Sequence, residues 1–104
     1  MASFQTVVPH QLGLAEARAR LESVLPELAA GFGDHVSELV GTWQENELQY
    51  GFTAVGMKVS GRIVVEELAA RVHCQLPFAA MLFRGRIEQE IRTHLTHALK
   101  PHST

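Results

Sequence analysis

The chain has 104 residues, of which 46% are hydrophobic and 19% charged, and its net charge is -2. These values are typical of one globular domain that buries about 65% of its unfolded surface, and they exclude a disordered body or a basic nucleic-acid binder. Cys74 is the single cysteine, so no internal disulfide forms and a cytoplasmic location is expected. The N-terminus lacks a signal-peptide pattern, and the longest apolar run, residues 76–83, is far shorter than the about 20 residues of a membrane span. We expect an ordered body over about residues 4–99 and a short frayed tail.

A short strand at residues 4–8 opens the predicted fold, and Pro9 is expected to end it because proline has no amide hydrogen for a sheet. The next segment, residues 12–32, has the periodicity of an amphipathic helix. Pro26 lies on the polar side of this helix and should bend it, and the glycines within residues 31–33 should end it. The apolar stripe of the helix comprises Leu14, Ala17, Leu21, Val24, Leu25, Leu28 and Phe32.

Four strands are predicted next, at residues 36–43, 48–54, 57–65 and 71–76. The first alternates only weakly, whereas the other three alternate apolar and polar residues with the period of a half-buried strand. Their connections are too short to join parallel strands, so an antiparallel meander is expected. The last connection, residues 66–69, contains no Gly, Asn or Asp, and its turn chemistry is therefore weak.

A closing helix is predicted over about residues 79–99. Its apolar stripe comprises Ala80, Phe83, Ile87, Ile91, Leu95 and Ala98. The element order is then β-α-β-β-β-β-α, and one antiparallel sheet with both helices packed on one face would bury every stripe. The predicted class is α+β. The sequence leaves open which edge of the meander the first strand joins.

The segment LPFAAMLF, residues 76–83, stands directly before the closing helix and is almost wholly apolar. If the helix begins at Pro77, Phe78 and Leu82 lie more than about 130° from its apolar stripe, at about 100° per residue. In one interpretation the segment is partly irregular and folds over the open end of the sheet. In the other it forms an exposed apolar patch for a partner, a surface or a ligand. The members of this patch and the cations beside it would be Phe78, Met81, Leu82, Arg84 and Arg86.

No catalytic, cofactor or metal site is predicted, because no nucleophile is paired with a base and an orienting group. Cys74 falls on the apolar side of its strand and is expected to be a buried structural thiol. His94 and His97 have helical i,i+3 spacing, but no third metal ligand is indicated. His10 precedes the first helix and is expected to cap or pack at its start.

Five parts of the sequence form a recognisable set: PHQLGLAEARARL at the first helix, FGD at its end, Trp43, GFTAVGMKVSGRIVV in the central strands, and LPFAAMLFRGRIEQEIRTHL. Together they resemble the small bacterial polyhydroxyalkanoic acid system proteins, over about residues 7–99. The most specific parts are HQLGL and GRIEQEI, which look like fold signatures rather than catalytic ones. Residues 66–70 depart from the acidic, glycine-bearing turn expected of the family.

The resemblance implies an association with storage-polyester synthesis and assigns no catalytic residue. The leading hypothesis is a non-enzymatic accessory protein that contacts the polyester granule surface or a granule coat protein through the region around Phe78, Met81 and Leu82. An alternative is a carrier of apolar acyl-type ligands. Its pocket between sheet and helix would be lined by Tyr50, Phe52, Met57 and Ile91. A third possibility is a homodimer whose interface uses the same apolar patch.

Overall fold

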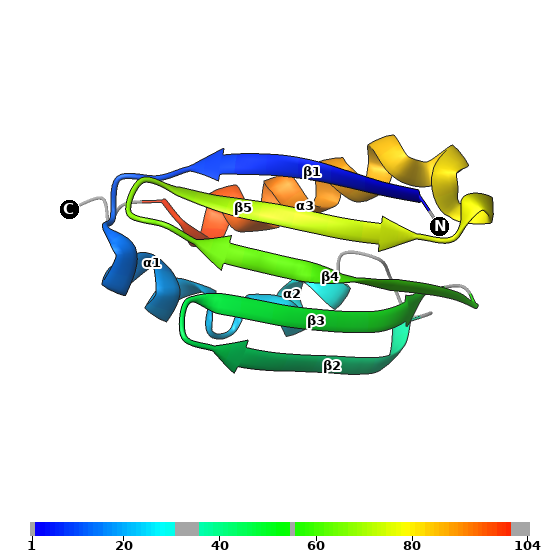
Figure 1. Ribbon diagram of the computed structural model, residues 1–104, viewed down its shortest axis with the longest axis horizontal. Helices are drawn as coiled ribbons and strands as arrows, with labels where there is room; N and C mark the ends of the chain where they lie inside the picture. The colour runs from blue at the N-terminus through cyan, green and yellow to red at the C-terminus, as the bar shows by residue number, and fades with distance from the viewer. Residues whose placement is uncertain (1, 31–35, 55, 101–104) are drawn as a thin grey trace.

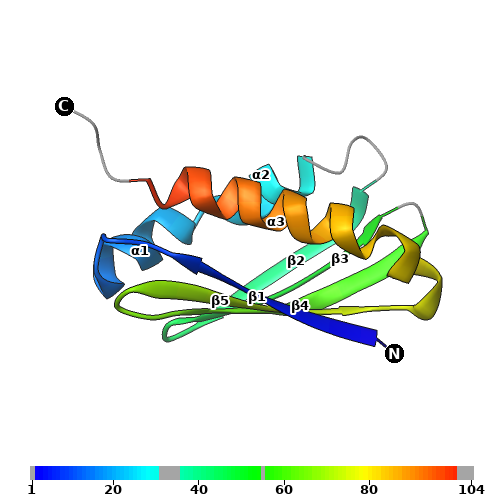
Figure 2. The ribbon, with the colours of Figure 1, turned by 90° about the horizontal axis from the view of Figure 1, so that it is seen from above.

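The computed structural model describes residues 2–30, 36–54 and 56–100. Within these ranges the chain forms a five-stranded antiparallel sheet of order β1-β5-β4-β3-β2, and the helices cover one face of it (Figure 1, Figure 2). The predicted α+β class is confirmed. The elements in chain order are β1 (Ala2–Pro9), α1 (Leu14–Leu21), α2 (Val24–Ala30), β2 (Val36–Gln44), β3 (Glu47–Ala54), β4 (Met57–Val65), β5 (Ala69–Leu76), the 3-10 helix η1 (Phe78–Phe83) and α3 (Arg84–Ala98).

Strand β1 forms one edge of the sheet and pairs with β5 along its whole length, which settles the edge that the sequence left open. Strands β2 to β5 form the predicted antiparallel meander. The register of β2 against β3 shifts between Ser37 and Val40, where Glu38 adopts a φ of 56°. An irregularity of this kind inserts unpaired residues into a strand. It therefore explains why residues 36–43 alternate only weakly.

The core lies between the helices and the covered face of the sheet. Leu21 of α1, Ile63 of β4 and Ile91 of α3 are all fully buried there. Burial of one such side chain contributes about 1.5 to 3 kcal/mol relative to exposure. The opposite face of the sheet contains polar side chains, including Arg62 and His73, which pair across β4 and β5. This distribution is typical of an antiparallel sheet with one solvated face.

The prediction of one long first helix is wrong, because α1 and α2 are separated by a turn at Glu22 and Ser23. Pro26 is the third residue of α2, so it cannot donate the helical hydrogen bond to the carbonyl of Glu22, and its ring crowds that carbonyl. Interruption of the helix at this point relieves the clash. The end predicted at residues 31–33 lies outside the described residues. Two members of the predicted stripe, Leu28 and Phe32, are outside the side chains that the structure describes, and of the others Ala17, Leu21, Val24 and Leu25 are buried.

The closing helix also begins later than predicted. Residues 78–83 form the 3-10 helix η1, and the α-helix starts only at Arg84. A 3-10 helix advances about 120° per residue, so the change of winding shifts the positions before Arg84 out of phase with the α-helical stripe. Phe83, predicted for the core, is 52% exposed. Farther along, Ile87, Ile91 and Leu95 are buried as predicted.

Candidate functional site

Three large apolar side chains of η1 are exposed to solvent. Phe78 is 73% exposed, Leu82 90% and Phe83 52%, and we refer to these three as the η1 cluster. Ala80 is fully buried, and Met81, which was predicted for the exposed patch, instead packs partly against the core. One side of η1 therefore anchors the segment, while the other side presents apolar surface to solvent.

The backbone at the start of η1 explains this division. Pro77 is extended, with φ -62° and ψ 154°, and its carbonyl accepts a hydrogen bond from the amide of Ala80 at 2.9 Å. The chain thus turns immediately after β5 into a tight helix of about three residues per turn. Such a helix can direct only about one residue per turn at the sheet. Ala80 takes that place, which leaves Phe78 and Leu82 on the outside.

Two arginines follow the η1 cluster. Arg84 and Arg86 are both exposed, and the guanidinium carbon of Arg84 lies 5.6 Å from the centroid of the Phe4 ring on β1. A guanidinium at that distance from a ring face is in the range of a cation–π contact. The first turn of α3 contains no acidic residue. The site is therefore apolar at its centre and cationic at its margin.

The motif residue His10 makes polar contacts at the opposite end of β5. Its Nε2 lies 2.9 Å from the carbonyl oxygen of Glu66, and its Nδ1 accepts the amide of Leu12 at 3.2 Å. Because Nδ1 accepts, Nε2 bears the hydrogen that it donates to Glu66. The amide of His10 also donates to the carbonyl of Leu68 at 2.9 Å. We call these contacts the His10 network; they fix the connection from β4 to β5.

The same connection caps α1. Gly13 precedes the helix with a φ of 79° and has no side chain with which to cap it. Glu67 supplies the missing acceptor, because its carboxylate accepts the amide of Leu14 at 3.2 Å. A negative charge at a helix N-terminus is also favourable toward the helix dipole. The HQLGL motif is therefore structural in this chain.

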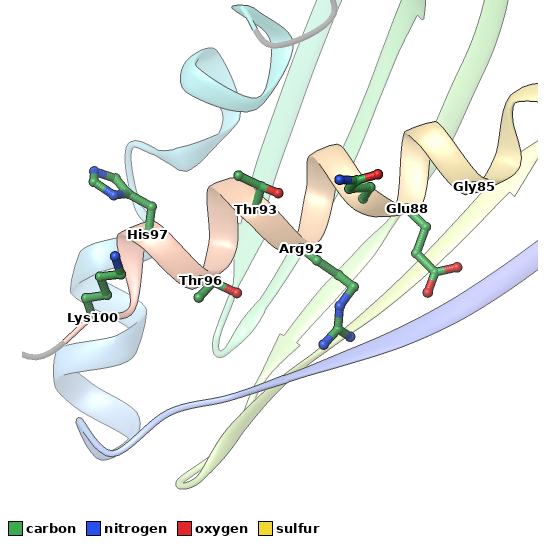
Figure 3. A pocket seen from close by; sticks show the side chains of 8 residues that line it. Gly85, Glu88, Arg92, Thr93, Thr96, His97 and Lys100 are labelled. Atoms are coloured by element: carbon green, nitrogen blue, oxygen red, sulfur yellow. The ribbon is translucent and has the colours of Figure 1, made fainter.

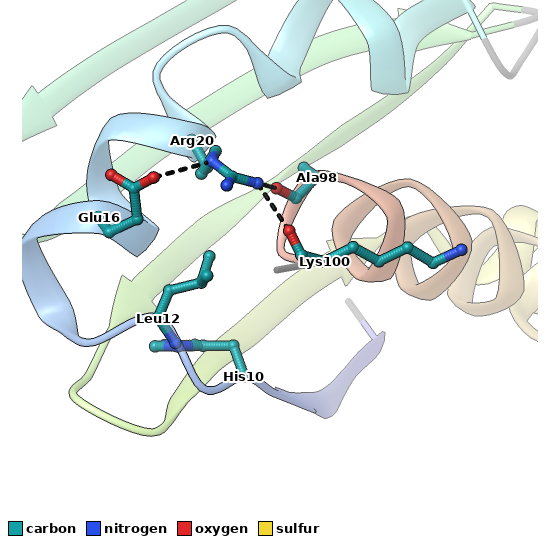
Figure 4. A network of polar contacts seen from close by, with 6 residues as sticks. All are labelled: His10, Leu12, Glu16, Arg20, Ala98 and Lys100. Carbon is teal, nitrogen blue, oxygen red and sulfur yellow. Dashed lines mark hydrogen bonds and ion pairs between the residues drawn. The ribbon is translucent and has the colours of Figure 1, made fainter. Parts of the chain in front are cut away.

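Arg20 connects α1 to the end of α3 (Figure 4). Its Nε donates to the Glu16 carboxylate at 3.2 Å, and its Nη1 donates to the carbonyls of Ala98 at 3.3 Å and Lys100 at 2.7 Å. The last carbonyls of a helix have no partner within the helix. Arg20 satisfies them at the end of α3 and so has a structural role.

Cys74 and Tyr50 form the buried ionisable pair at the centre of the sheet. Burial raises the pKa of the Cys74 thiol to about 11, and the neighbouring Tyr50 side chain acts in the opposite direction. Burial, and after it the neighbouring Cys74, raises the pKa of Tyr50 above its usual range. The Tyr50 hydroxyl donates to the carbonyl of His73 at 3.2 Å. Both groups are uncharged near neutral pH, and this is the state of an inert structural thiol rather than a nucleophile.

The helix histidines are not brought together around a metal. His94 faces Glu90 at 3.4 Å, and no group of three or more metal-binding side chains occurs among the described residues. His97 lines an open hollow of about 560 Å³ along the solvent side of α3 (Figure 3). Arg92, which also lines it, is already bound to β1 through the Thr6 hydroxyl at 2.6 Å. The other residues around the hollow are Gly85, Glu88, Gln89, Thr93, Thr96 and Lys100.

The residues predicted to line a ligand pocket lie in or against the core. Tyr50, Phe52 and Ile91 are buried, and Met57 is half-buried beside them. The rings of Tyr50 and Phe52 stack with centroids 6.4 Å apart. A hollow on the open face of the sheet includes Tyr50. These four residues act as packing side chains in this structure.

The fold and the η1 cluster define a class: a small α+β protein in which a C-terminal helix packs across a five-stranded antiparallel sheet and an exposed apolar segment joins the two. No helix among the described residues is long and apolar enough to cross a membrane. The chain belongs to the family described as "Putative polyhydroxyalkanoic acid system protein", which it matches over residues 5–99. The resemblance predicted from the sequence is thereby confirmed.

Two solved structures are similar to the chain at low sequence identity. The di-domain ARO/CYC BexL from the BE-7585A biosynthetic pathway shares the fold, with a TM-score of 0.51 and 12% identity, over 98% of this chain and 51% of that chain. The chain thus spans about half the length of BexL. TTHA0849 from Thermus thermophilus matches with a TM-score of 0.41 and 11% identity, over 94% of this chain and 92% of that chain. No curated protein matches the sequence.

Proposed function

We propose that the protein is a non-enzymatic accessory protein of polyhydroxyalkanoate metabolism that attaches to storage-polyester granules through the η1 cluster. Membership of the polyhydroxyalkanoic acid system family supports the association with these polyesters. The observation that carries the attachment is the exposure of Phe78 and Leu82, at 73% and 90%, on a segment whose other side is anchored in the core. Grouped exposed apolar side chains are typical of contact sites.

The energetics favour a reversible contact. Complete burial of one large apolar side chain contributes about 1.5 to 3 kcal/mol, so Phe78 and Leu82 together offer about 3 to 6 kcal/mol. Association and the ordering of side chains oppose a part of this gain. A few apolar side chains therefore give weak, reversible attachment of each molecule.

Co-sedimentation with purified granules tests the proposal. The native protein is expected to sediment with granules, and the Phe78→Ser, Leu82→Ser double variant to lose at least about tenfold in affinity, because its apolar contact is removed. The matched control is the Val40→Ser, Leu68→Ser double variant, since these residues are 63% and 69% exposed at other places. The control should sediment like the native protein.

Granules stripped of their coat proteins distinguish the two modes of attachment. Sedimentation with native and stripped granules places the contact on the granule surface, whereas sedimentation with native granules alone places it on a coat protein. Absence of sedimentation with either would refute the proposal. Light scattering detects a dimer formed through the η1 cluster, which would also contradict it. If the double variant fails to fold, Leu82→Ser alone gives the same comparison at the most exposed position of η1.

A further inference from the structure

We infer that the η1 end of the molecule binds an anionic phospholipid surface, with the η1 cluster among the acyl chains and Arg84 and Arg86 against the headgroup phosphates. This inference rests on the proposed function and names the chemistry of the surface that the site meets. An apolar group bordered by cations is the usual composition of segments that lie in a lipid interface. Guanidinium groups are also well suited to phosphate, because they bind it in a bidentate manner.

The arginines of the chain divide into two groups according to their partners. Five of the seven arginines bind other described residues through hydrogen bonds or ion pairs. These pairs are Arg18 with Glu22, Arg20 with Glu16, Arg62 with Glu47, Arg71 with Glu66, and Arg92 with Thr6. Arg84 and Arg86 form no ion pair with any described residue. Arg84 and Arg86, the two arginines beside the η1 cluster, are therefore the two that form neither an ion pair nor a hydrogen bond with a described residue, whereas Arg92 is held by uncharged partners.

The residues of η1 and the first turn of α3 include two cations and no anion, although the whole chain has a net charge of -2, and the next acidic residues, Glu88 and Glu90, lie one helical turn farther along α3. The chain contains no Asp or Glu from residue 68 to residue 87. Strand β4 begins at the end of the sheet where β5 passes into η1 (Figure 1). The exposed Lys58 lies there, two residues before Ser60, which pairs with Gln75. Glu38 lies on β2, the edge strand farthest from β1, and its carboxylate accepts the hydroxyl of Thr53.

The positions of these cations suit a flat surface. Every residue from Leu82 to Arg86 is exposed, so the end of η1 and the first turn of α3 protrude together. The guanidinium of Arg84 lies against the ring of Phe4 on β1, which is not a member of the η1 cluster. Side chains at the centre can then enter an apolar layer while the cations stay at the level of the phosphates.

The alternative occupants fit this charge less well. A second copy would meet the site through a two-fold axis, which places Arg84 and Arg86 near the same residues of its partner. Like charges brought together at an interface oppose association. An uncharged polyester surface would accept the apolar side chains but offers nothing to the two cations. An anionic lipid layer satisfies both parts of the site.

Vesicle sedimentation tests the inference. The probes are vesicles of phosphatidylcholine alone and vesicles in which about one third of the lipid is phosphatidylglycerol. The native protein is expected to bind the anionic vesicles and to be released by salt. Each cation near an anionic surface contributes about a fivefold factor, so the Arg84→Gln, Arg86→Gln variant should bind about thirtyfold more weakly. The Phe78→Ser, Leu82→Ser variant should also lose binding.

The Arg62→Gln, Arg71→Gln variant is the charge-matched control, because it removes two exposed arginines from the open face of the sheet. It should bind within about twofold of the native protein if position rather than net charge governs the contact. Equal losses in the two arginine variants would overturn the inference. Granule binding without vesicle binding would also overturn it and leave the proposed function standing. Vesicle binding without granule binding would support the lipid contact and refute the granule proposal.

Discussion

The residues at the two ends of β5 differ in whether their side chains have partners within the fold. Before the strand, the connection from β4 is held by the His10 network and by the contact of Glu67 with α1. After the strand, η1 leaves Phe78 and Leu82 exposed and is followed by two arginines without ion-pair partners among the described residues. The first end of β5 therefore stabilises the fold, whereas the second end presents a surface for contact with a partner. Changes at the first end should lower stability, and changes at the second should alter binding with little effect on folding.

The largest effect on stability is expected from His10→Ala. The substitution removes the partners of the Glu66 carbonyl and the Leu12 amide, and His10 itself is only 7% exposed. Unsatisfied backbone groups cost about 1 to 3 kcal/mol each, so the free energy of unfolding should fall by about 3 kcal/mol. Urea unfolding measures this change. Granule binding per folded molecule should be unchanged.

Two variants serve as controls for His10→Ala. His73→Ala alters a half-buried histidine on the open face of the sheet and should change the free energy of unfolding by less than about 1 kcal/mol. Phe78→Ala at the η1 end should change it by less than about 0.5 kcal/mol, because that side chain is largely exposed. A larger loss in Phe78→Ala than in His10→Ala would contradict the distinction between the two ends.

The centre of β5 should respond to alkaline pH. The pKa of Cys74 is about 11 in the folded protein and 9.0 without the effect of burial. Between these values the unfolded chain loses a proton that the folded chain retains, so stability falls as pH rises, by about 3 kcal/mol in all. The raised pKa of Tyr50 acts in the same direction. Urea midpoints measured from pH 7 to about pH 11 give the slope, which should be shallower in Cys74→Ala. A slope unchanged in that variant would contradict the assignment to Cys74.

Further effects are expected at the cap of α1. Gly13→Ala forces a residue with a Cβ into a φ of 79° and a ψ of 164° and places that Cβ 3.3 Å from the Glu67 carboxylate. This backbone conformation is essentially restricted to glycine, so alanine should cost about 1 to 3 kcal/mol. Glu67→Gln keeps an acceptor but removes the charge at the helix N-terminus, which should cost about 0.5 kcal/mol. Thermal unfolding detects both changes. Loss of granule binding in either variant would contradict a purely structural role.

The sequence predicted much of the fold because burial leaves a periodic pattern in the chain. The meander of β2 to β5, the α+β class and the buried face of α3 from Ile87 to Leu95 all follow from alternation or helical spacing. Part of the candidate site was predicted for the same reason. Phe78 and Leu82 fall off the helical stripe, and the structure leaves them exposed. The partial burial of Met81 was not predicted, because the 3-10 geometry of η1 cannot be read from periodicity alone.

Other features were decided only by the tertiary structure. The pairing of β1 with β5 joins segments that are far apart in the chain, and either edge of the meander would bury the apolar side chains of β1. The turn at residues 66–68 lacks local turn residues and is held by His10, which is 56 positions away from Glu66. Sequence patterns indicate which side of a helix or strand is buried, because that side is set by the polarity of successive residues along the element. They do not report which distant groups meet, because the meeting depends on how all the elements close around one core.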